Sequence, residues 1–494
     1  MSRRKRPEAV DPSRRDFLFK GACAALTATG IASSIWDLRM INAAAADSIR
    51  FGNATKGTAA GGGMAAANDP DGYKALVCIF LFGGNDGNNL LIPTDEPRYT
   101  NSYAGPRGAL AIPLTSIQSA GTGLNPLNPP NGGGSYGLHP GMPELASLFN
   151  TGKAAVVANV GTLLAPITRA QYLAKSVAVP QQLFSHQDQQ IEWQTCVNDG
   201  PSKTGWGGRT ADLLYSLNGN NKVSMNISLA GANTFEVGNV INEYNVSTGG
   251  AVSLNIPTNT AGAAQSQALK DLLALNHTNL YESAYTKQMG TALDNASLLT
   301  SAIAPTAATV WNPLFPNTSL GNQLKMIARL IAAAPTLGHN RQIFFAAIGG
   351  FDLHGSEGAV MGAQAGLLAD LSKSMNAFYQ ATQSLGVADR VTSYTASDFS
   401  RTFGVNGTAG TDHGWGNHHL VMGGSVVGQN LYGTFPTLAI NGPDDTSTGR
   451  WIPTTSVDQY SATLAKWFGV SAGNMTQVFP YLGRFATPDL GFMG

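Results

Sequence analysis

The feature that most constrains this chain is a series of short, almost continuously apolar segments. The clearest is ALVCIFLF at 75–82, and AAVVANV at 154–160 and QIFFAAI at 342–348 have the same character. A weaker, alternating segment at 390–397 and an apolar segment at 419–427 complete the set. A strand covered on both faces has this continuous composition, whereas a half-exposed strand alternates apolar and polar residues. The sequence therefore predicts a sheet that is buried on both faces.

Segments with helical periodicity lie between these strands. In 322–335, Leu324 and Ile331 fall on one apolar stripe, and the helix predicted at 363–385 is followed by Gly386, a typical helix terminator. Two more helices are predicted, from MPELASLFNTGK before the second strand and from 456–469. Strands that alternate with helices favour an α/β fold, with a mostly parallel central sheet and helices on both faces.

The segment 198–316 interrupts this alternation. It is rich in Asn, Gly, Ser and Thr, and one helix is predicted in it around 265–299. We expect it to be an insertion within a single domain at 74–494, where it could cap one end of the sheet.

The N-terminus resembles a twin-arginine export signal. SRRDFLFK at 13–20 has two arginines, an Ala/Thr-rich apolar stretch follows at 21–34, and small residues suited to cleavage lie at 42–47. The apolar stretch is too short for a good membrane span. We therefore expect a signal peptide at 1–46, a Gly/Ala-rich linker at 47–73, export by the twin-arginine translocase to the periplasm or the exterior, and no membrane span in the mature chain.

Charge and cysteine content restrict the partners further. Charged residues make up 12% of the chain and the formal net charge is zero, so nucleic acid and anionic lipid, which need a basic surface, are not expected partners. Cys78 and Cys196 remain after removal of the signal, and a disulfide between them is one alternative in an oxidising compartment. The apolar surroundings of Cys78 favour a buried free thiol.

Acidic and imidazole side chains follow several predicted strands. Asp86 follows the first in GGNDGNN, Asp352 and His354 follow the third in GGFDLHG, and Asp398 and Arg401 follow the fourth in SDFSRT. Ligands of parallel α/β sheets bind beyond the carboxyl ends of the strands, so these side chains are candidates for one common site.

The segment that enters the fifth strand, TDHGWGNHHLVMGG at 411–424, is rich in histidine. It contains Asp412 and His413 before the apolar run, and His418 and His419 at its start. We expect His413 to bind metal, and His418 and His419 to be spacers or to contact the ligands.

Carboxylates gathered at one sheet end repel one another, and a divalent cation relieves that repulsion. Mixed Asp/His ligation suits Zn, Mn or Fe, whereas ligation by oxygen alone favours Ca or Mg. The predicted cofactor is therefore a divalent metal ion, with Zn, Mn, Ca and Mg as the alternatives.

Two serines are candidate nucleophiles. Ser185, in LFSHQDQQIEW, is a predicted helix N-cap, where the helix end favours an anion, and His186 and Asp188 follow in the first turn. The segment GGSYG at 133–137 has the G-x-S-x-G spelling of a serine hydrolase, but it follows NPLNPPNG rather than a strand. Ser185 is the better candidate on this ground.

Several of these motifs resemble a known family. FLFGGNDGNNLLIP, FSHQDQ, GGFDLHG, SDFSRT and GTDHGWGNHHLVMGGSVVGQNLYG, with the twin-arginine leader, are similar to the bacterial family called domain of unknown function 1501. That family is distantly similar to the alkaline phosphatase and sulfatase superfamily, in which Asp and His residues at strand ends bind metal and a residue at a helix start attacks phosphorus or sulfur.

The superfamily resemblance implies a role for each candidate residue. Ser185 would be the nucleophile, with His186 as an alternative functional residue, and Arg401 would bind a nonbridging oxygen. The implied metal ligands are Asp86, Asp352, His354, Asp398 and His413. The chain departs from the superfamily in two places: one residue separates Asp352 from His354 where three are typical, and Phe399 follows Asp398 where a histidine is frequent.

Two functions follow from these observations. The first is an exported metal-dependent hydrolase that acts on phosphate or sulfate esters, either in a small molecule or in a surface polymer. The alternative is a non-catalytic envelope protein that keeps a hydrolase-like fold and binds a polymer, a glycan or another protein. The two differ in whether the acidic and imidazole side chains lie within reach of one metal ion.

Overall fold

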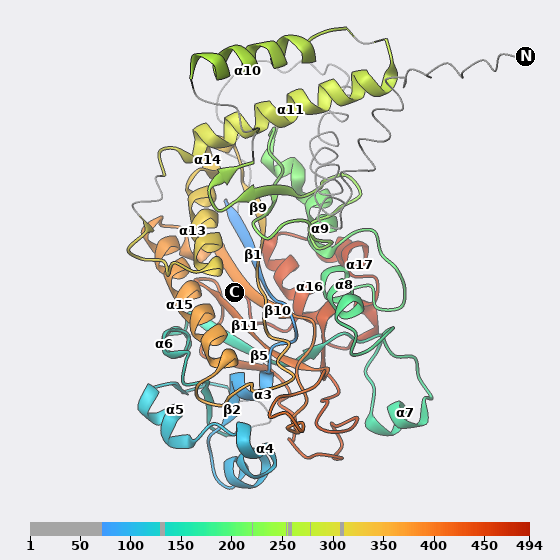
Figure 1. Cartoon of the computed structure of the whole chain (residues 1–494). Coiled ribbons are helices and arrows are strands. Elements are labelled where there is room, and N and C mark those ends of the chain that lie inside the picture. Colours follow the sequence, from blue (N-terminus) through green and yellow to red (C-terminus); the bar gives the residue numbers. More distant parts are fainter. Residues whose placement is uncertain are drawn as a thin grey trace, which may run out of the picture.

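The computed structural model describes residues 72–128, 134–219, 221–252, 254, 259–276, 278–306 and 311–494 (Figure 1). The predicted signal peptide at 1–46 and nearly all of the predicted linker at 47–73 lie outside these residues.

A large mixed sheet forms the centre of the molecule. Its strands, in spatial order, are β12 (Leu431–Gly433), β5 (Ala154–Gly161), β11 (Asn417–Gly423), β10 (Val391–Ser397), β1 (Lys74–Leu81), β9 (Arg341–Ile348), β6 (Asn226–Ser228), β7 (Tyr244–Ser247) and β8 (Gly250–Ala251), and β13 (Thr455–Ser456) also pairs with β5. Most pairs are parallel; β11 is antiparallel to both of its neighbours, and β8 is antiparallel to β7. The prediction of a mostly parallel α/β sheet is confirmed.

A small antiparallel sheet accompanies the central one. It consists of β2 (Leu91–Pro93), β4 (Tyr136–Leu138) and β3 (Gly123–Leu124).

Alternate side chains of β1 enter two separate apolar cores. Val77 and Ile79 belong to the core formed with α6 (Pro143–Asn150), α13 (Ser319–Ala332) and α15 (Ala363–Ser384). Cys78 and Phe80 belong to the core formed with α8 (His186–Thr195), α9 (Trp206–Leu214) and α16 (Val457–Phe468). The continuous apolar run in the sequence thus reflects helices on both faces of the sheet, which Figure 1 shows.

Most of the predicted strands and helices agree with the observed ones to within a few residues, but the single helix expected around 265–299 is two helices, at Thr260–Leu273 and Leu280–Ile303. Another difference is at Pro335, where a helix was expected to stop; the chain continues as α14 (Ala334–Leu337), because proline is tolerated in the first turn of a helix. The remaining helices are α3 (Gly87–Leu90), α4 (Gly105–Arg107), α5 (Leu114–Ala120), α7 (Arg169–Ala174), α10 (Thr260–Leu273), α11 (Leu280–Ile303) and α17 (Met475–Val478).

The strands of the expected insertion at 198–316 join the central sheet, and two of its helices pack at one end of that sheet. Its strands β6 and β7 extend the central sheet beyond β9. Its helices α10 and α11 pack together, and α11 contacts α14, which lies just before β9 (Figure 1). These helices therefore lie beside the end of the sheet at which β9 begins, whereas Asp352 follows the opposite end of β9.

Cys78 and Cys196 are buried free thiols. Within the described part of the chain, no helix has the length and apolar character that crossing a membrane requires.

Candidate metal centre

The candidate site lies at the sheet edge where β1, β9 and β10 end. These strands run parallel, and β5 runs in the same direction because it and β10 are both antiparallel to β11. The loops after β9 and β10, the loop that enters β11, and the segment that leads from β5 to α8 therefore all reach this edge.

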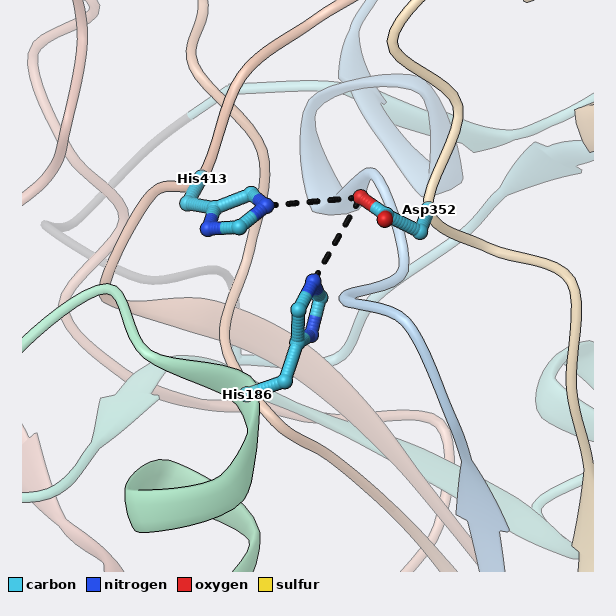
Figure 2. Close-up of side chains that lie close together, drawn as sticks. All are labelled: His186, Asp352 and His413. Atoms are coloured by element: carbon cyan, nitrogen blue, oxygen red, sulfur yellow. Dashed lines mark ion pairs between the residues drawn. The ribbon is translucent and has the colours of Figure 1, made fainter. Parts of the chain in front are cut away.

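Three side chains from three of these segments could hold one metal ion. His186, Asp352 and His413 each offer one ligand atom, and these atoms lie within 4.8 Å of one another. Asp352 Oδ1 is 3.5 Å from His186 Nε2 and 3.4 Å from His413 Nε2, and Figure 2 shows both imidazoles directed at the carboxylate. His186 comes from the start of α8, Asp352 from the loop after β9, and His413 from the loop before β11.

His354 lies next to this group. Its Nε2 is 3.0 Å from Asp352 Oδ1 and 3.0 Å from His413 Nε2. Three imidazoles thus present the same ring atom to one carboxylate oxygen, an arrangement that suits transition-metal ligation.

Each imidazole has its other ring nitrogen occupied. His186 Nδ1 is 2.6 Å from Asp398 Oδ2, His354 Nδ1 is 3.1 Å from Asp412 Oδ1, and His413 Nδ1 is 2.6 Å from the Phe184 carbonyl oxygen. Since the carbonyl can only accept, His413 Nδ1 donates, and the carboxylates favour the same tautomer in the other two rings. Outer partners of this kind orient metal-binding histidines.

This tautomer leaves lone pairs on the Nε2 atoms that face one another. If His354 and His413 are both neutral, the lone pairs on their Nε2 atoms face each other across 3.0 Å. That contact is repulsive unless a proton or a metal ion lies between the two nitrogens. His186 Nε2 is buried and has no hydrogen-bond partner among the described residues. A cation bound by these atoms would satisfy both features, so the donor set fits a divalent metal.

Arg401 fixes the carboxylate of the group. Its Nη1 donates to Asp352 Oδ1 at 2.7 Å and to the Gly83 carbonyl at 3.1 Å, and its Nη2 donates to the Thr411 carbonyl at 2.5 Å. The side chain of Arg401 is 1% exposed. The implied role of Arg401 in binding a substrate oxygen stays a prediction; in the structure its guanidinium donates to Asp352 and to two backbone carbonyls.

The local charges set the protonation preferences of the group. Burial by itself would raise the pKa of Asp352, but the hydrogen bond and charge of Arg401, with His186 and His354, lower it. The hydrogen bond to Asp398 raises the pKa of His186 in spite of partial burial. Burial lowers the pKa of His413, and the positive charges of His186 and Arg401 act in the same direction. The lowered pKa values favour ionised Asp352 and neutral His413, the forms that bind metal, whereas the raised pKa of His186 means that a metal ion would compete with a proton at that ring.

Comparison with protein families assigns the chain. The model of the family described as "Protein of unknown function (DUF1501)" matches residues 73–474. The chain belongs to this family.

Similar solved structures are remote. The crystal structure of Ps i-CgsB in complex with k-i-k-neocarrahexaose is 10% identical, with a TM-score of 0.31, over 84% of this chain and 77% of that chain. The crystal structure of Ps i-CgsB alone is 9% identical, with a TM-score of 0.32, over the same shares. No curated protein matches the sequence.

Asp398 lies behind a candidate ligand of this DUF1501 protein. Its Oδ2 accepts from His186 Nδ1, from Gln190 Nε2 at 2.9 Å and from the Gly83 amide at 3.2 Å. The expectation that Asp398 binds metal directly stays a prediction; in the structure Asp398 lies outside the possible ligand group and contacts the Nδ1 atom of His186. Sequence analysis missed Gln190, although its position one turn after His186 in α8 places the two on the same helix face.

Asp86 is engaged elsewhere at the same sheet edge. It caps α3, with its Oδ1 accepting from the Asn88 amide at 3.1 Å, and its Oδ2 forms a fully buried ion pair with Arg107. Arg107 also lies 3.9 Å from Glu357, whose pKa is raised to about 8 by burial and then by the charge of Asp86. The expected metal role of Asp86 stays a prediction; in the structure Asp86 lies outside the possible ligand group and its charge is paired with that of Arg107.

Ser185 occupies the predicted N-cap position of α8, directly before His186. Its hydroxyl does not cap the helix but donates to Asp188 Oδ2 at 2.5 Å. The chain thus places a carboxylate-bound hydroxyl next to a candidate ligand, at a helix N-terminus.

His418 and His419 are buried in β11 and belong to neither the ligand group nor its outer partners. His418 Nδ1 accepts from the Asn159 amide at 3.1 Å, and the ring of His419 packs against Trp193. Burial lowers the pKa of both imidazoles to about 3. They are buried residues of the sheet, which agrees with the first of the two expected roles, that of spacers.

Proposed function

We propose that this DUF1501 protein is an exported metal-dependent hydrolase that acts on phosphate or sulfate esters. One observation supports this above the others: the Nε2 atoms of three histidines surround one oxygen of Asp352, and a separate partner occupies each Nδ1. Three imidazoles with one carboxylate favour Zn, Mn or Fe over Ca or Mg.

In such an enzyme, different residues of the site would orient the metal ligands and supply the nucleophile. Asp398 and the Phe184 carbonyl hold two imidazoles in the tautomer that presents Nε2, and Arg401 holds Asp352. A metal bound there would supply Lewis-acid stabilisation and a lowered pKa for a coordinated oxygen. Ser185 is the proposed nucleophile, because Asp188 accepts its hydrogen and the start of α8 favours developing negative charge.

The superfamily and the location are parts of the same proposal. The motifs similar to alkaline phosphatases and sulfatases support ester hydrolysis, and the arginine pair with its apolar stretch supports twin-arginine export to the periplasm or the exterior. A folded, metal-loaded protein is the kind of cargo this route carries.

Elemental analysis of the exported protein tests the metal assignment. His413→Ala and Asp352→Ala are each expected to lower bound metal in protein that remains folded by circular dichroism. His139→Gln is the control, because His139 is a buried histidine that contacts the Ala359 carbonyl and lies outside the ligand group. Stoichiometric metal that is unchanged in both ligand variants would defeat the assignment.

A panel of phosphate and sulfate esters tests the reaction separately. Ser185→Ala is expected to abolish turnover and to keep the metal, because Ser185 is not in the ligand group. Turnover that survives loss of metal would make the metal structural. Bound metal without turnover of any ester would favour the alternative, an envelope binding protein, for which the 44% exposure of the Asp352 side chain provides an accessible surface.

A further inference from the structure

A second arginine approaches the candidate metal centre from the loop between β12 and β13. Arg450 Nε donates to the His413 carbonyl at 2.7 Å, and its guanidinium lies 4.8 Å from the centre of the Phe184 ring. Phe184 is the residue whose carbonyl holds His413, and it directly precedes Ser185. Arg450 therefore contacts both the segment that presents the proposed nucleophile, through Phe184, and the segment that presents a proposed ligand, through His413.

Arg450 forms no ion pair within the described part of the chain. Its side chain contacts neutral groups: the His413 carbonyl, the Ser447 hydroxyl at 3.4 Å and the Phe184 ring. The buried carboxylate of Asp445 is close, but its oxygens accept backbone amides, including that of Arg450 itself at 2.9 Å. No ion pair joins Asp445 to the guanidinium.

Two arginines near this edge are paired with carboxylates. Arg401 is bound to Asp352 and Arg107 to Asp86. The neutral contacts of the half-buried Arg450 guanidinium use only part of its five N–H donors and leave its charge unpaired, and an external anion would bind the remaining donors. Guanidinium binds tetrahedral oxyanions and carboxylates through paired hydrogen bonds.

We infer that Arg450 binds a negatively charged oxyanion group of the substrate beside the metal centre, where Arg401 is already paired with Asp352. The inference rests on the proposed function for the identity of the site. It narrows the substrate to molecules that carry a sulfate, phosphate or carboxylate group within reach of His413.

Calorimetric titration with inorganic sulfate, and separately with inorganic phosphate, tests the inference on full-length mature protein. Arg450→Gln is expected to weaken binding of at least one anion by about tenfold or more, as loss of a charged hydrogen bond requires. Arg450→Lys is expected to keep part of the affinity, since the charge remains. Arg390→Gln, before β10 and thus at the opposite end of the sheet, is the matched control and should bind as the unmodified protein does.

The metal content of each variant separates binding from positioning. The inference requires that Arg450→Gln keep its metal while it loses anion affinity. It is overturned by unchanged anion affinity, by the absence of anion binding in the unmodified protein, or by loss of metal together with anion binding, which would show that Arg450 only supports His413. Should Arg450→Gln fail to fold, Arg450→Lys decides the matter. The inference then requires a weaker equilibrium affinity of Arg450→Lys for at least one anion. Full affinity of Arg450→Lys for both anions overturns it.

The same titrations distinguish this inference from the proposed function. Unmodified protein that binds no metal but loses anion affinity in Arg450→Gln would defeat the metal-dependent hydrolase and leave the anion site standing. If the unmodified protein binds metal and Arg450→Gln has the same anion affinity, only the anion site is defeated.

Discussion

Replacement of Asp398 by Asn is the sharpest perturbation of the candidate metal centre. Asp398 does not belong to the group that could hold the metal, yet its Oδ2 is 2.6 Å from His186 Nδ1. Asn has nearly the same shape and can still accept a hydrogen from His186, but it lacks the negative charge. The variant therefore tests the charge behind the imidazole and leaves the ligands in place.

The magnitude follows from the bonds that change. A hydrogen bond to a charged group contributes about 1.5–3 kcal/mol, against about 0.5–1.5 kcal/mol between neutral groups. Loss of the charge should thus weaken metal binding by roughly 1–1.5 kcal/mol, or about tenfold in Kd. This agrees with the low end of the roughly 10–100-fold losses seen when partners of metal-binding histidines are removed.

The assay is metal titration against a competing chelator, with circular dichroism to show that the variant is folded. Asp212→Asn is the matched control, because the Asp212 carboxylate accepts three backbone amides at 2.6, 2.8 and 3.1 Å in the loop that precedes β7. A folded Asp398→Asn protein with unchanged Kd for the metal, or an equal loss in Asp212→Asn, would refute the assigned role of Asp398.

Three further predictions address other parts of the structure. Arg107→Met should lower the free energy of unfolding by roughly 3–5 kcal/mol in urea denaturation, because it leaves Asp86 buried and uncompensated, and adding Asp86→Asn should restore part of the loss. His339 is buried and its pKa is lowered to about 4, so the unfolded chain takes up a proton before the folded chain does as the pH falls from about 6.5 to 4, and the free energy of unfolding declines in that window. His339→Gln should remove about 2 kcal/mol of that decline at pH 5. A pH profile of stability identical to that of the unmodified protein would contradict this. Gly83→Ala should destabilise the fold by roughly 1–3 kcal/mol and weaken metal binding, since Gly83 has φ +111° and an added Cβ would lie 2.5 Å from the Asp352 amide nitrogen; unchanged melting temperature and metal content would count against the tight packing of these loops.

The sequence determined the fold class and the positions of the main strands. Continuous burial on both faces leaves a local signal, so the segments predicted at 75–82, 154–160 and 342–348 are strands within a residue of their predicted bounds. The direction of β11 has no such signal. Its antiparallel course depends on pairing with β10 and β5, which are distant in the chain.

The sequence also indicated which residue types gather at the carboxyl ends of the strands, because an aspartate or histidine after a buried strand is visible without a structure. It could not rank Asp86 against Asp352, since both follow a strand in a glycine-rich turn. Only the tertiary structure separated them: Arg107 pairs with Asp86, while His186 and His413 surround Asp352. The physical reason is that the role of a carboxylate depends on which charge reaches it, and here that charge comes from another segment of the chain.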